Sequence, residues 1–446
     1  TVLKSWRPIT VGDCIASIVE KCAAAQFSEF LETHNILYSS QHGFRQKVGC
    51  STAICEFTNT IRQRDAKFAI VCLLDAENAF GRPTHEQIMA NLASCCDENA
   101  LKWFEGFLGN RKFFVQSGGG ESDVYDLPPA GAGQGSGVAP ILFSFVYNNV
   151  LLVADAITNV TAFADDLCYI SMGDTYAECE ENVRATGEYV GEAMKAQSNI
   201  NIAPAKSMVL RAGNGLKKKV QSEEPRNPIT INGQVVAEPD VVTYLGVRFG
   251  PNLDIEPHLR YLKSRIYLAG HKAGRTRLYG NPRQSCQLFA SIANGVFNHG
   301  LDCQPFLSRK WYTEIQSVNN SGYKEILGLQ YHQIKRPISQ RDLLIRAGNQ
   351  RTAEHSHKYL IMNRLNTVWV TGRPKRMYEK LKECVYLESG YEPLRPDSAG
   401  QGREVRWKYE REFAMGDHVT FLDWPIKFDP KKMLSPEFKK SWPYYT

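Results

Sequence analysis

The sequence lacks the long hydrophobic segments of a membrane protein. No stretch of 18 apolar residues occurs, and the longest apolar run, around Val146–Ala156, is interrupted by Asn148, Asn149 and Asp155. We therefore expect no membrane partner. No signal or transit peptide pattern follows Thr1, so we expect a mature fragment or an excised part of a longer chain.

Closely spaced cysteines are also scarce. The 12 cysteines are scattered along the chain, their only close pair is Cys95–Cys96, and no CxxC motif occurs. A small secreted domain held by disulfides would be shorter and richer in cysteine, so a reducing intracellular compartment is favoured. Because the histidines are dispersed as well, the pattern argues against a structural zinc site.

What is present is a chain of ordinary composition with unevenly distributed charge. Its 446 residues leave room for roughly three domains, and 43% hydrophobic with 22% charged residues is typical of a folded protein. Between His258 and Lys382 there are 22 Lys and Arg against 6 Asp and Glu, whereas the rest of the chain has 31 against 41. This basic segment favours a nucleic-acid partner, although a solvated helical surface would carry the same charge.

Hydrophobic periodicity predicts a mixture of helices and strands. Helices are expected over 11–35, 52–64, 84–96, 99–108, 140–156 and 176–197, and mainly helices from 256 to about 365. Strands are expected over 68–74, 112–117, 160–164, 167–171, 207–211 and 241–249, and a polar linker over 213–228. The sequence after residue 390 has no sustained period. These elements indicate an α+β fold.

Three carboxylates stand at the ends of apolar strands. Asp75 follows the run FAIVCLL, and Asp165 with Asp166 lies between two short strands that form a predicted hairpin. Rigid strand ends could hold two divalent cations about 3.5–4 Å apart, which is the geometry for in-line phosphoryl transfer. Ligand sets made only of oxygen suit Mg²⁺. Most isolated Asp–Asp pairs, however, lie in solvated turns.

Around these carboxylates the chain carries an ordered series of motifs. They are WRPIT (Trp6–Thr10), QHGFR (Gln41–Arg45), LLDAENAF (Leu73–Phe80), GAGQGS (Gly131–Ser136), FADD (Phe163–Asp166), APAKS (Ala203–Ser207) and YLGV (Tyr244–Val247). In this order the motifs resemble the reverse transcriptases of non-LTR retrotransposons, across about residues 4–365. The resemblance implies a right-hand polymerase, with fingers and palm over 1–254, a basic helical thumb over 255–345, and a helical extension and tail over 346–446.

The resemblance also implies catalytic residues. Asp75, Asp165 and Asp166 resemble the carboxylates that bind two Mg²⁺ ions in the palm, and Lys206 resembles a lysine that donates a proton to pyrophosphate. Lys206 could equally be a solvated loop lysine. Residues 244–247 (Tyr244, Leu245, Gly246 and Val247) resemble the hairpin that grips the primer.

Further residues resemble those that contact the nucleotide and the template. They are Arg7, Arg45, Phe80, Gly133, Gln134 and Gly135. Arg45 would bind the triphosphate, or else form a surface salt bridge. Phe80 would exclude the 2′-hydroxyl and so select dNTPs, which argues against an RNA-dependent RNA polymerase, or else belong to the core. The family usually has proline where this chain has Gly133.

The implied function is RNA-directed DNA synthesis with an RNA template, a DNA primer or target and dNTPs. No endonuclease, zinc knuckle or ribonuclease H pattern is recognisable in the sequence. The alternative is therefore a catalytically idle, RNA-binding scaffold of a large ribonucleoprotein, contacted through the tail at 390–446. We expect an intracellular location. An active element would act in the nucleus, whereas a domesticated one would be found in mitochondria or at the location of another ribonucleoprotein.

Overall fold

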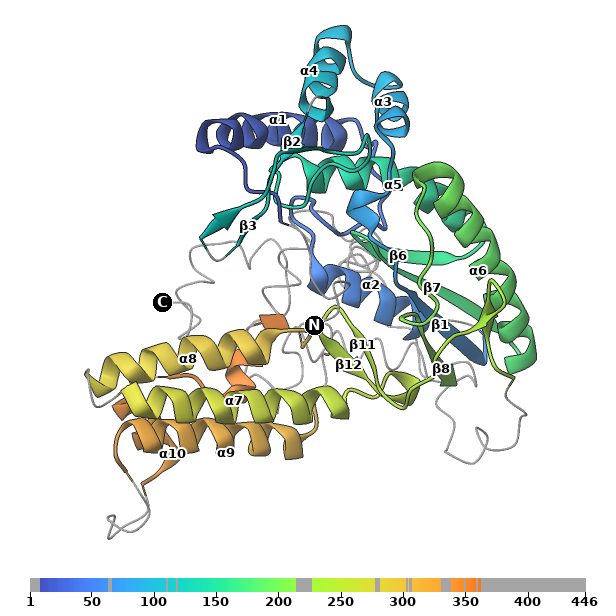
Figure 1. The fold of residues 1–446 in the computed structure, drawn as a ribbon. Helices are drawn as coiled ribbons and strands as arrows, with labels where there is room; N and C mark the ends of the chain where they lie inside the picture. The colour runs from blue at the N-terminus through green and yellow to red at the C-terminus, as the bar shows by residue number, and fades with distance from the viewer. Residues whose placement is uncertain are drawn as a thin grey trace, which may run out of the picture. The chain divides into compact units, whose positions relative to one another are not determined.

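The computed structural model describes residues 9–62, 66–109, 111–117, 119–213, 227–276, 281–301, 304, 307–329, 338–348, 350–357 and 360–361. The chain divides into two compact units (Figure 1). Unit 1 comprises residues 1–53 and 60–240, and unit 2 comprises residues 54–59 and 241–446. No helix within the described ranges is both long and apolar enough to cross a bilayer.

Unit 1 is built on a four-stranded antiparallel sheet. Its order is β6 (Asn159–Phe163), β7 (Asp166–Gly173), β1 (Phe68–Leu74) and β8 (Met208–Gly213). Every residue of β1 is buried, as expected for a central strand whose two faces are both covered. The register pairs Leu74 of β1 with Leu167 of β7, and Phe163 of β6 with Asp166.

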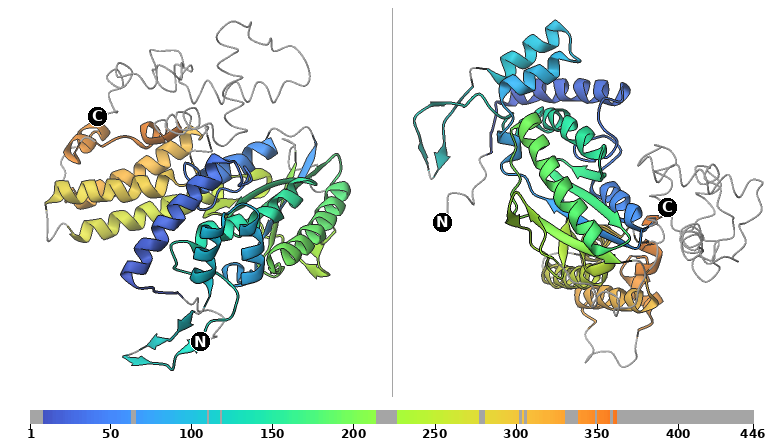
Figure 2. Two further views of the ribbon diagram at one scale, coloured as in Figure 1. Left: turned by 90° about the horizontal axis from the view of Figure 1, so that it is seen from above. Right: turned by 90° about the vertical axis from the view of Figure 1, so that its right-hand side faces the viewer.

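Two helices pack against this sheet. Helix α6 (Tyr176–Ser198) contacts β1 and β7, and α5 (Ala139–Asp155) contacts β6 and α6 (Figure 2). Helix α5 is mostly apolar and most of its residues are buried, which is typical of a helix that packs with more than one of its sides. The Thr175 side chain caps the first turn of α6, and Asn199 ends it in the left-handed conformation.

A second cluster of helices completes unit 1. Helices α1 (Cys14–Thr33), α3 (His85–Ala93) and α4 (Glu98–Leu108) pack with one side of α5 around Phe27, Phe104 and Phe145. The other elements of unit 1 are short. They are η2 (Ala79–Gly81), β2 (Lys112–Phe113), β3 (Gln116–Ser117), β4 (Gly120–Glu121), β5 (Tyr125–Asp126), β9 (Thr230–Ile231) and β10 (Gln234–Val235).

Unit 2 combines a short hairpin with packed helices. The hairpin pairs β11 (Val242–Tyr244) with β12 (Val247–Phe249), followed by η4 (Pro251–Leu253). The helices are α7 (Glu256–Thr276), α8 (Pro282–Asn298), α9 (Arg309–Ile326) and α10 (Gln340–Arg346). Helices α7 and α9 approach closely because Gly270 and Gly322 face each other, and a Cβ on Gly270 would lie 3.0 Å from the Cα of Gly322.

The structure divides the chain after residue 240, whereas the sequence placed a boundary after 254. The hairpin belongs to unit 2 because Phe57, from α2 (Cys50–Arg62), packs edge-on against Tyr244 and Phe249. Most of the predicted domain at 346–446 lies outside the described residues.

Several predicted elements differ from the structure. The prediction of one continuous strand over 241–249 is wrong, because Leu245 and Gly246 both have positive φ angles and turn the chain back as a hairpin. The predicted strand at 112–117 is divided into β2 and β3. Most described cysteines are free thiols, the exception being Cys55, which is disulfide-bonded.

Candidate active site

Two of the predicted carboxylates lie at facing strand ends in unit 1. Asp75 follows β1 directly, and Asp166 begins β7. Extending the β1–β7 register by one residue beyond Leu74–Leu167 sets Asp75 opposite Asp166. Residues directly opposite in an antiparallel pair have Cα atoms roughly 4.5–5.5 Å apart. The register therefore aligns the ends of two strands that carry carboxylates about 90 residues apart in the sequence.

Asp165 lies in the tight turn between β6 and β7. Because Phe163 pairs with Asp166, only Ala164 and Asp165 form the loop. Ala164 has a φ angle of +58°, a conformation that costs energy for a residue with a Cβ atom. Asp165 and Asp166 are thus presented by a short, constrained turn.

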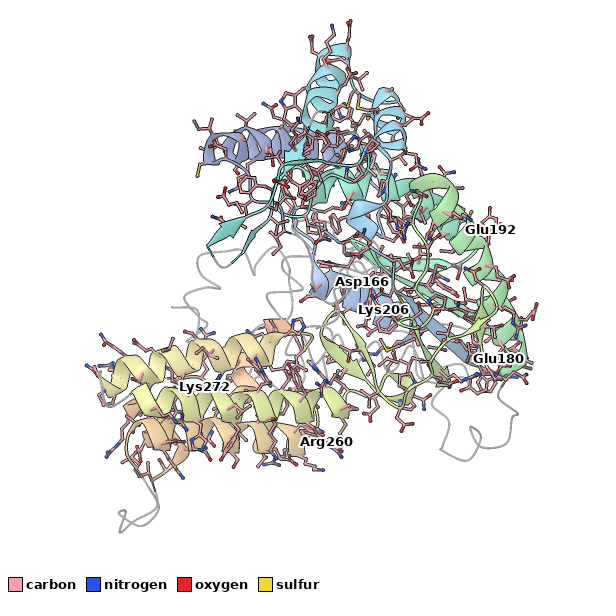
Figure 3. The ribbon with its side chains drawn as sticks, viewed as in Figure 1. Asp166, Glu180, Glu192, Lys206, Arg260 and Lys272 are labelled. Carbon is pink, nitrogen blue, oxygen red and sulfur yellow. The ribbon has the colours of Figure 1, made fainter. Side chains whose placement is uncertain are left out.

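The APAKS segment wraps around Asp75. The carbonyl of Asp75 accepts a hydrogen bond from the Ala203 amide at 2.8 Å, and the Asp75 amide donates to Ser207 Oγ at 3.2 Å. Lys206 Nζ lies 3.7 Å from Asp75 Oδ1, with 70% of its side chain exposed. Figure 3 labels Lys206 and Asp166. Lys206 thus lies beside Asp75, a position that agrees with a proton donor and equally with a solvated surface ion pair, so its catalytic role stays a prediction.

The negative charges of Asp165 and Asp166 affect two neighbouring side chains. Burial raises the pKa of the Tyr147 phenol, and the charges of Asp165 and Asp166 raise this pKa further. Burial likewise raises the pKa of the Cys50 thiol, with a smaller contribution from Asp166. An accumulation of negative charge at fixed positions is a property that a cation site requires.

The carboxylates suit Mg²⁺ by ligand chemistry, although they do not form a closed cage. Within the described ranges, no three His, Cys, Asp or Glu side chains gather closely enough to hold a metal ion by themselves. Mg²⁺ usually binds through one or two carboxylates and completes its shell with water and substrate phosphates. Carboxylates at exposed strand ends, such as Asp75 and Asp166, fit that mode of binding.

Phe80 lies in a group of aromatic rings near Asp75. It follows Asp75 through a tight turn into η2 and stacks on Phe143 of α5, with ring centroids 4.5 Å apart. The ring of Phe44, which is 45% exposed, lies edge-on to Phe80 at 6.0 Å. Phe80 is partly buried against the core, so both predicted roles, nucleotide contact and core packing, agree with its position.

Arg45 has a different environment from the predicted one. Its guanidinium forms a bidentate ion pair with Glu32 at 2.8 Å and donates to the carbonyls of Tyr38 and Gln41 at 2.7 and 3.1 Å. Only 4% of the side chain is exposed. Four of the five guanidinium N–H groups are thereby used inside the protein, so the arrangement disagrees with a triphosphate-binding role. Arg45 therefore forms a salt bridge, as in the alternative prediction, but this salt bridge is buried rather than on the surface.

The glycines of GAGQGS allow close approach between two parts of unit 1. Gly133 and Gly135 have φ angles of +78° and +111°. A Cβ on Gly135 would lie 2.3 Å from the carbonyl oxygen of Thr10, whose amide donates to the Gln134 carbonyl at 2.6 Å. Proline cannot adopt the φ angle of Gly133, so this loop differs from one with the proline usual in the family. The glycines contact protein backbone here, and their predicted contact with nucleotide and template stays a prediction.

The hairpin predicted to grip the primer is held by two histidines of unit 2. His299 Nε2 contacts the carbonyl of Leu245 at 2.9 Å and would clash with a Cβ on Gly246. His258 Nε2 contacts the carbonyl of His299 at 2.9 Å, and the Arg248 amide donates to His258 Nδ1 at 3.4 Å. Neither histidine was predicted from the sequence, because no local motif marks residues that support a hairpin from distant helices.

His258 is expected to make unit 2 sensitive to acid. It is fully buried, and burial lowers its pKa from 6.5 to about 4, the hydrogen bond to His299 opposing the shift in part. As the pH falls from 6.5 to about 4, the unfolded chain binds a proton at this position and the folded chain does not. The stability that is complete above pH 6.5 should fall by about 3 kcal/mol over this range.

Hydrogen exchange of the α7 amides at pH 7 and pH 4.5 measures this loss. The decrease in protection of these amides between pH 7 and pH 4.5 should be smaller in His258→Gln than in wild type. It should be unchanged in His34→Gln, which alters an exposed histidine. Equal pH dependence in wild type and His258→Gln would contradict the prediction.

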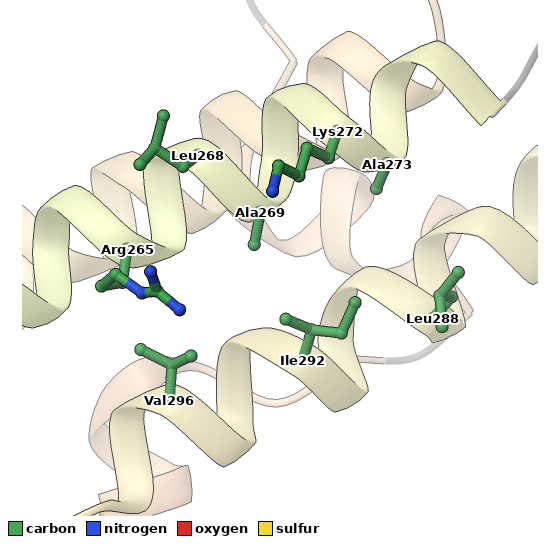
Figure 4. A pocket seen from close by; sticks show the side chains of 8 residues that line it. All are labelled: Arg265, Leu268, Ala269, Lys272, Ala273, Leu288, Ile292 and Val296. Carbon is green, nitrogen blue, oxygen red and sulfur yellow. The ribbon is translucent and has the colours of Figure 1, made fainter. Parts of the chain in front are cut away.

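Helix α7 of unit 2 exposes a basic surface. Arg260, Arg265 and Lys272 are all exposed, and Figure 3 labels the first and last of them. Between α7 and α8 lies a pocket with a volume of about 340 Å³ (Figure 4). Its lining combines cationic and apolar side chains from both helices, namely Arg265, Leu268, Ala269, Lys272, Ala273, Leu288, Ile292 and Val296. Arg7 and the tail at 390–446 lie outside the described residues.

Comparison with known proteins identifies the family. Residues 2–249 match the family described as reverse transcriptase (RNA-dependent DNA polymerase). The chain is 22% identical over 375 residues to a probable RNA-directed DNA polymerase from transposon BS of Drosophila melanogaster, covering 80% of this chain and 40% of that protein. It is 23% identical over 269 residues to the RNA-directed DNA polymerase from mobile element jockey of Drosophila funebris, covering 58% of this chain and 28% of the relative. The chain thus spans well under half the length of these relatives.

Among solved structures, apo telomerase from Candida tropicalis aligns with a TM-score of 0.40 at 9% identity, covering 89% of this chain and 61% of that chain. This likeness is too weak to support an argument. The family match, by contrast, extends over more than half of the chain and includes all seven motifs. The predicted α+β class of a right-hand polymerase is confirmed on this ground. The chain belongs to the reverse transcriptase (RNA-dependent DNA polymerase) family, as a domain of the non-LTR retrotransposon type.

Proposed function

We propose that this domain is an active RNA-directed DNA polymerase that extends a primer 3′-hydroxyl with dNTPs on an RNA template. The observation that carries the proposal is the β1–β7 register, which, continued by one residue beyond Leu74–Leu167, sets Asp75 opposite Asp166, with Asp165 in the adjoining turn. A chain that has lost catalysis is under no constraint to retain three acids at one edge of a sheet. Their joint presence favours activity over an idle scaffold.

In this proposal Asp75, Asp165 and Asp166 hold two Mg²⁺ ions. Bound there, the ions would activate the primer hydroxyl and neutralise the leaving pyrophosphate. The protein contributes rigidity, because β1, β7 and their turn fix the carboxylates before the substrates arrive. Lys206, beside Asp75 and largely exposed, can move toward the departing pyrophosphate and donate a proton to it.

The choice of sugar is assigned to Phe80. Its ring is held by the stack on Phe143, so a 2′-hydroxyl that meets it cannot displace it without disrupting the packing of α5. Gly133, Gln134 and Gly135 form the adjacent backbone on which template and nucleotide would lie. We assign the template–primer duplex to the basic side chains of α7, because clustered Lys and Arg attract the phosphate backbone.

Primer extension on an RNA template with a DNA primer, Mg²⁺ and either dNTPs or NTPs tests the proposal. The expected result is extension with dNTPs, little with NTPs, and none by an Asp165→Ala control that still binds RNA. Synthesis that persists in Asp165→Ala would contradict the assignment of the site. Absence of synthesis by the wild type, with tight RNA binding, would instead support a ribonucleoprotein scaffold, in which the tail at 390–446 becomes the candidate contact.

The same proposal carries an expected location. A polymerase that copies RNA into chromosomal DNA must reach the nucleus, so we propose that the domain acts there.

A further inference from the structure

A buried glutamine holds the turn that carries two of the proposed metal ligands. The side chain of Gln41 is fully buried against Ala164, the residue before Asp165. Its Oε1 accepts a hydrogen bond from the Ala164 amide at 2.9 Å, and its Nε2 donates to the Ala164 carbonyl at 3.2 Å. One side-chain amide thus satisfies both backbone polar groups of the residue at the start of the turn.

The backbone around Gln41 also pairs with the strand that leads into the turn. The Ala162 amide of β6 donates to the Ser40 carbonyl at 2.9 Å, and the His42 amide donates to the Ala162 carbonyl at 2.8 Å. These bonds form a short parallel bridge between Gln41 and Ala162. The QHGFR segment therefore extends the sheet beyond β6 and fixes Gln41 in register with the turn.

Gly43 permits this close approach. A Cβ at residue 43 would lie 2.2 Å from the backbone nitrogen of Ala164, which is too close for any side chain. The Gly43 amide donates to the same Gln41 Oε1 at 2.8 Å and so orients the side-chain amide. His42 Nδ1 contacts Thr52 Oγ1 at 2.8 Å and ties the segment to α2.

These contacts explain how the turn keeps an unfavourable conformation. Ala164 has positive φ, which persists only where the surroundings hold it in place. Ala164 is also buried, so without Gln41 its amide and carbonyl would lose partners that water could not readily replace. Glutamine suits the position because glutamate lacks the N–H donor, and an apolar residue lacks both functions.

We propose that Gln41 is a positioning residue for catalysis, which fixes Asp165 and Asp166 by binding the Ala164 peptide groups. This inference rests on the proposed polymerase function. It assigns to the QHGFR segment the support of the carboxylate turn rather than contact with the triphosphate, in agreement with the buried ion pair of Arg45.

Gln41→Met tests the inference, because methionine has a similar volume and no hydrogen-bonding amide. Hydrogen exchange at the Ala164 amide should become at least about 10-fold faster, since that amide loses its acceptor. The rate of synthesis should fall by about 10–100-fold, the range typical for residues that orient metal ligands. The Mg²⁺ concentration for half-maximal activity should rise, while the KM for dNTPs changes little.

Gln46→Met is the matched control. It makes the same chemical change five residues away at an exposed position, and it should alter none of these quantities. Retained protection of the β1 amides in Gln41→Met would show that the sheet remains folded. A second pair of variants tests the same contact by adding a methyl group. Gly43→Ala should disturb the turn, because its Cβ would clash with Ala164, whereas Gly49→Ala should not, because its methyl group lies in open space.

Two results would overturn the inference: unchanged exchange at Ala164 in Gln41→Met, or faster exchange with an unchanged rate of synthesis. A wild type that synthesises no DNA would refute the polymerase function separately. In that case Gln41 is judged by exchange at Ala164 and by Mn²⁺ binding followed by electron paramagnetic resonance. Weaker Mn²⁺ binding in Gln41→Met than in Gln46→Met would still support positioning of the carboxylates, and equal binding would refute it.

Discussion

Replacing Asp75 by asparagine is expected to lower the rate of nucleotide addition by a factor of about 1,000 or more. The proposed site depends on carboxylate charge at the ends of β1 and β7, and an amide of the same shape cannot supply it. A metal ion contributes several kcal/mol of charge stabilisation to the transition state, and each 1.36 kcal/mol corresponds to a factor of ten in rate. Single-turnover primer extension measures the change directly.

The fold should tolerate this substitution. The hydrogen bonds that fix Asp75 come from its own amide and carbonyl, to Ser207 and from Ala203, and both remain in the variant. The Asp75 side chain is 40% exposed, so its replacement by asparagine leaves no buried charge or cavity. Loss of activity together with an unchanged denaturation curve would locate the effect in the chemistry rather than in folding.

Glu77→Gln is the matched control for Asp75→Asn. Both variants convert a carboxylate into an amide in the same segment, but Glu77 is exposed and lies 3.7 Å from Arg82 in a surface ion pair. Its replacement should change the rate by less than about threefold, as expected for a charge outside the site. Equal losses in the two variants would contradict the assignment of Asp75.

Replacing Arg211 by methionine is expected to destabilise unit 1 by about 3–5 kcal/mol. Arg211 lies on β8 and is only 4% exposed, and its guanidinium pairs with Glu180 of α6 at 2.5 Å and with Glu238 at 2.8 Å. Figure 3 labels Glu180 on α6. Removing the cation leaves the buried Glu180 carboxylate without its main counter-charge, and this loss rather than the loss of contact area dominates the expected cost.

Neighbouring groups offset only part of this cost. The amide and the side chain of Asn227 donate to the two oxygens of Glu180 at 3.2 and 3.0 Å, and these neutral donors remain in the variant. The double variant Arg211→Met with Glu180→Gln should recover part of the lost stability, because it removes the uncompensated charge. Failure of the double variant to recover would indicate that packing is the larger contribution.

Urea denaturation followed by circular dichroism, supported by hydrogen exchange in β1, measures the stability of these variants. Arg184→Met is the control, since Arg184 forms a short ion pair with Glu181 on the same helix as Glu180, but at the surface. That variant should lose less than about 1 kcal/mol. A comparable loss in Arg184→Met and Arg211→Met would contradict the argument from burial.

Much of unit 1 could be predicted from the sequence. Strand β1 was expected over 68–74 and has these bounds, because an unbroken apolar run flanked by polar residues is stable as a buried strand. Asp75 was recognisable because it ends that run, and the Asp165–Asp166 turn because two apolar strands flank it. The local sequence pattern was sufficient to predict these features because the environment of each residue depends mainly on its neighbours in the sequence.

Tertiary structure decided what depends on partners distant in sequence. The QHGFR motif marked Arg45, but whether its guanidinium binds a substrate or Glu32 is settled by where α1 places that carboxylate. The motif also contained Gln41, yet its contact with Ala164, 123 residues away, leaves no trace in local periodicity. His258 likewise contacts the carbonyl of His299, 41 residues away, a partner that no local pattern marks. Sequence alone determined the four strands of the unit 1 sheet, the positions of the carboxylates and the family, because local patterns indicate them. Burial, pairing and support depend on distant segments, so only the tertiary structure decided them.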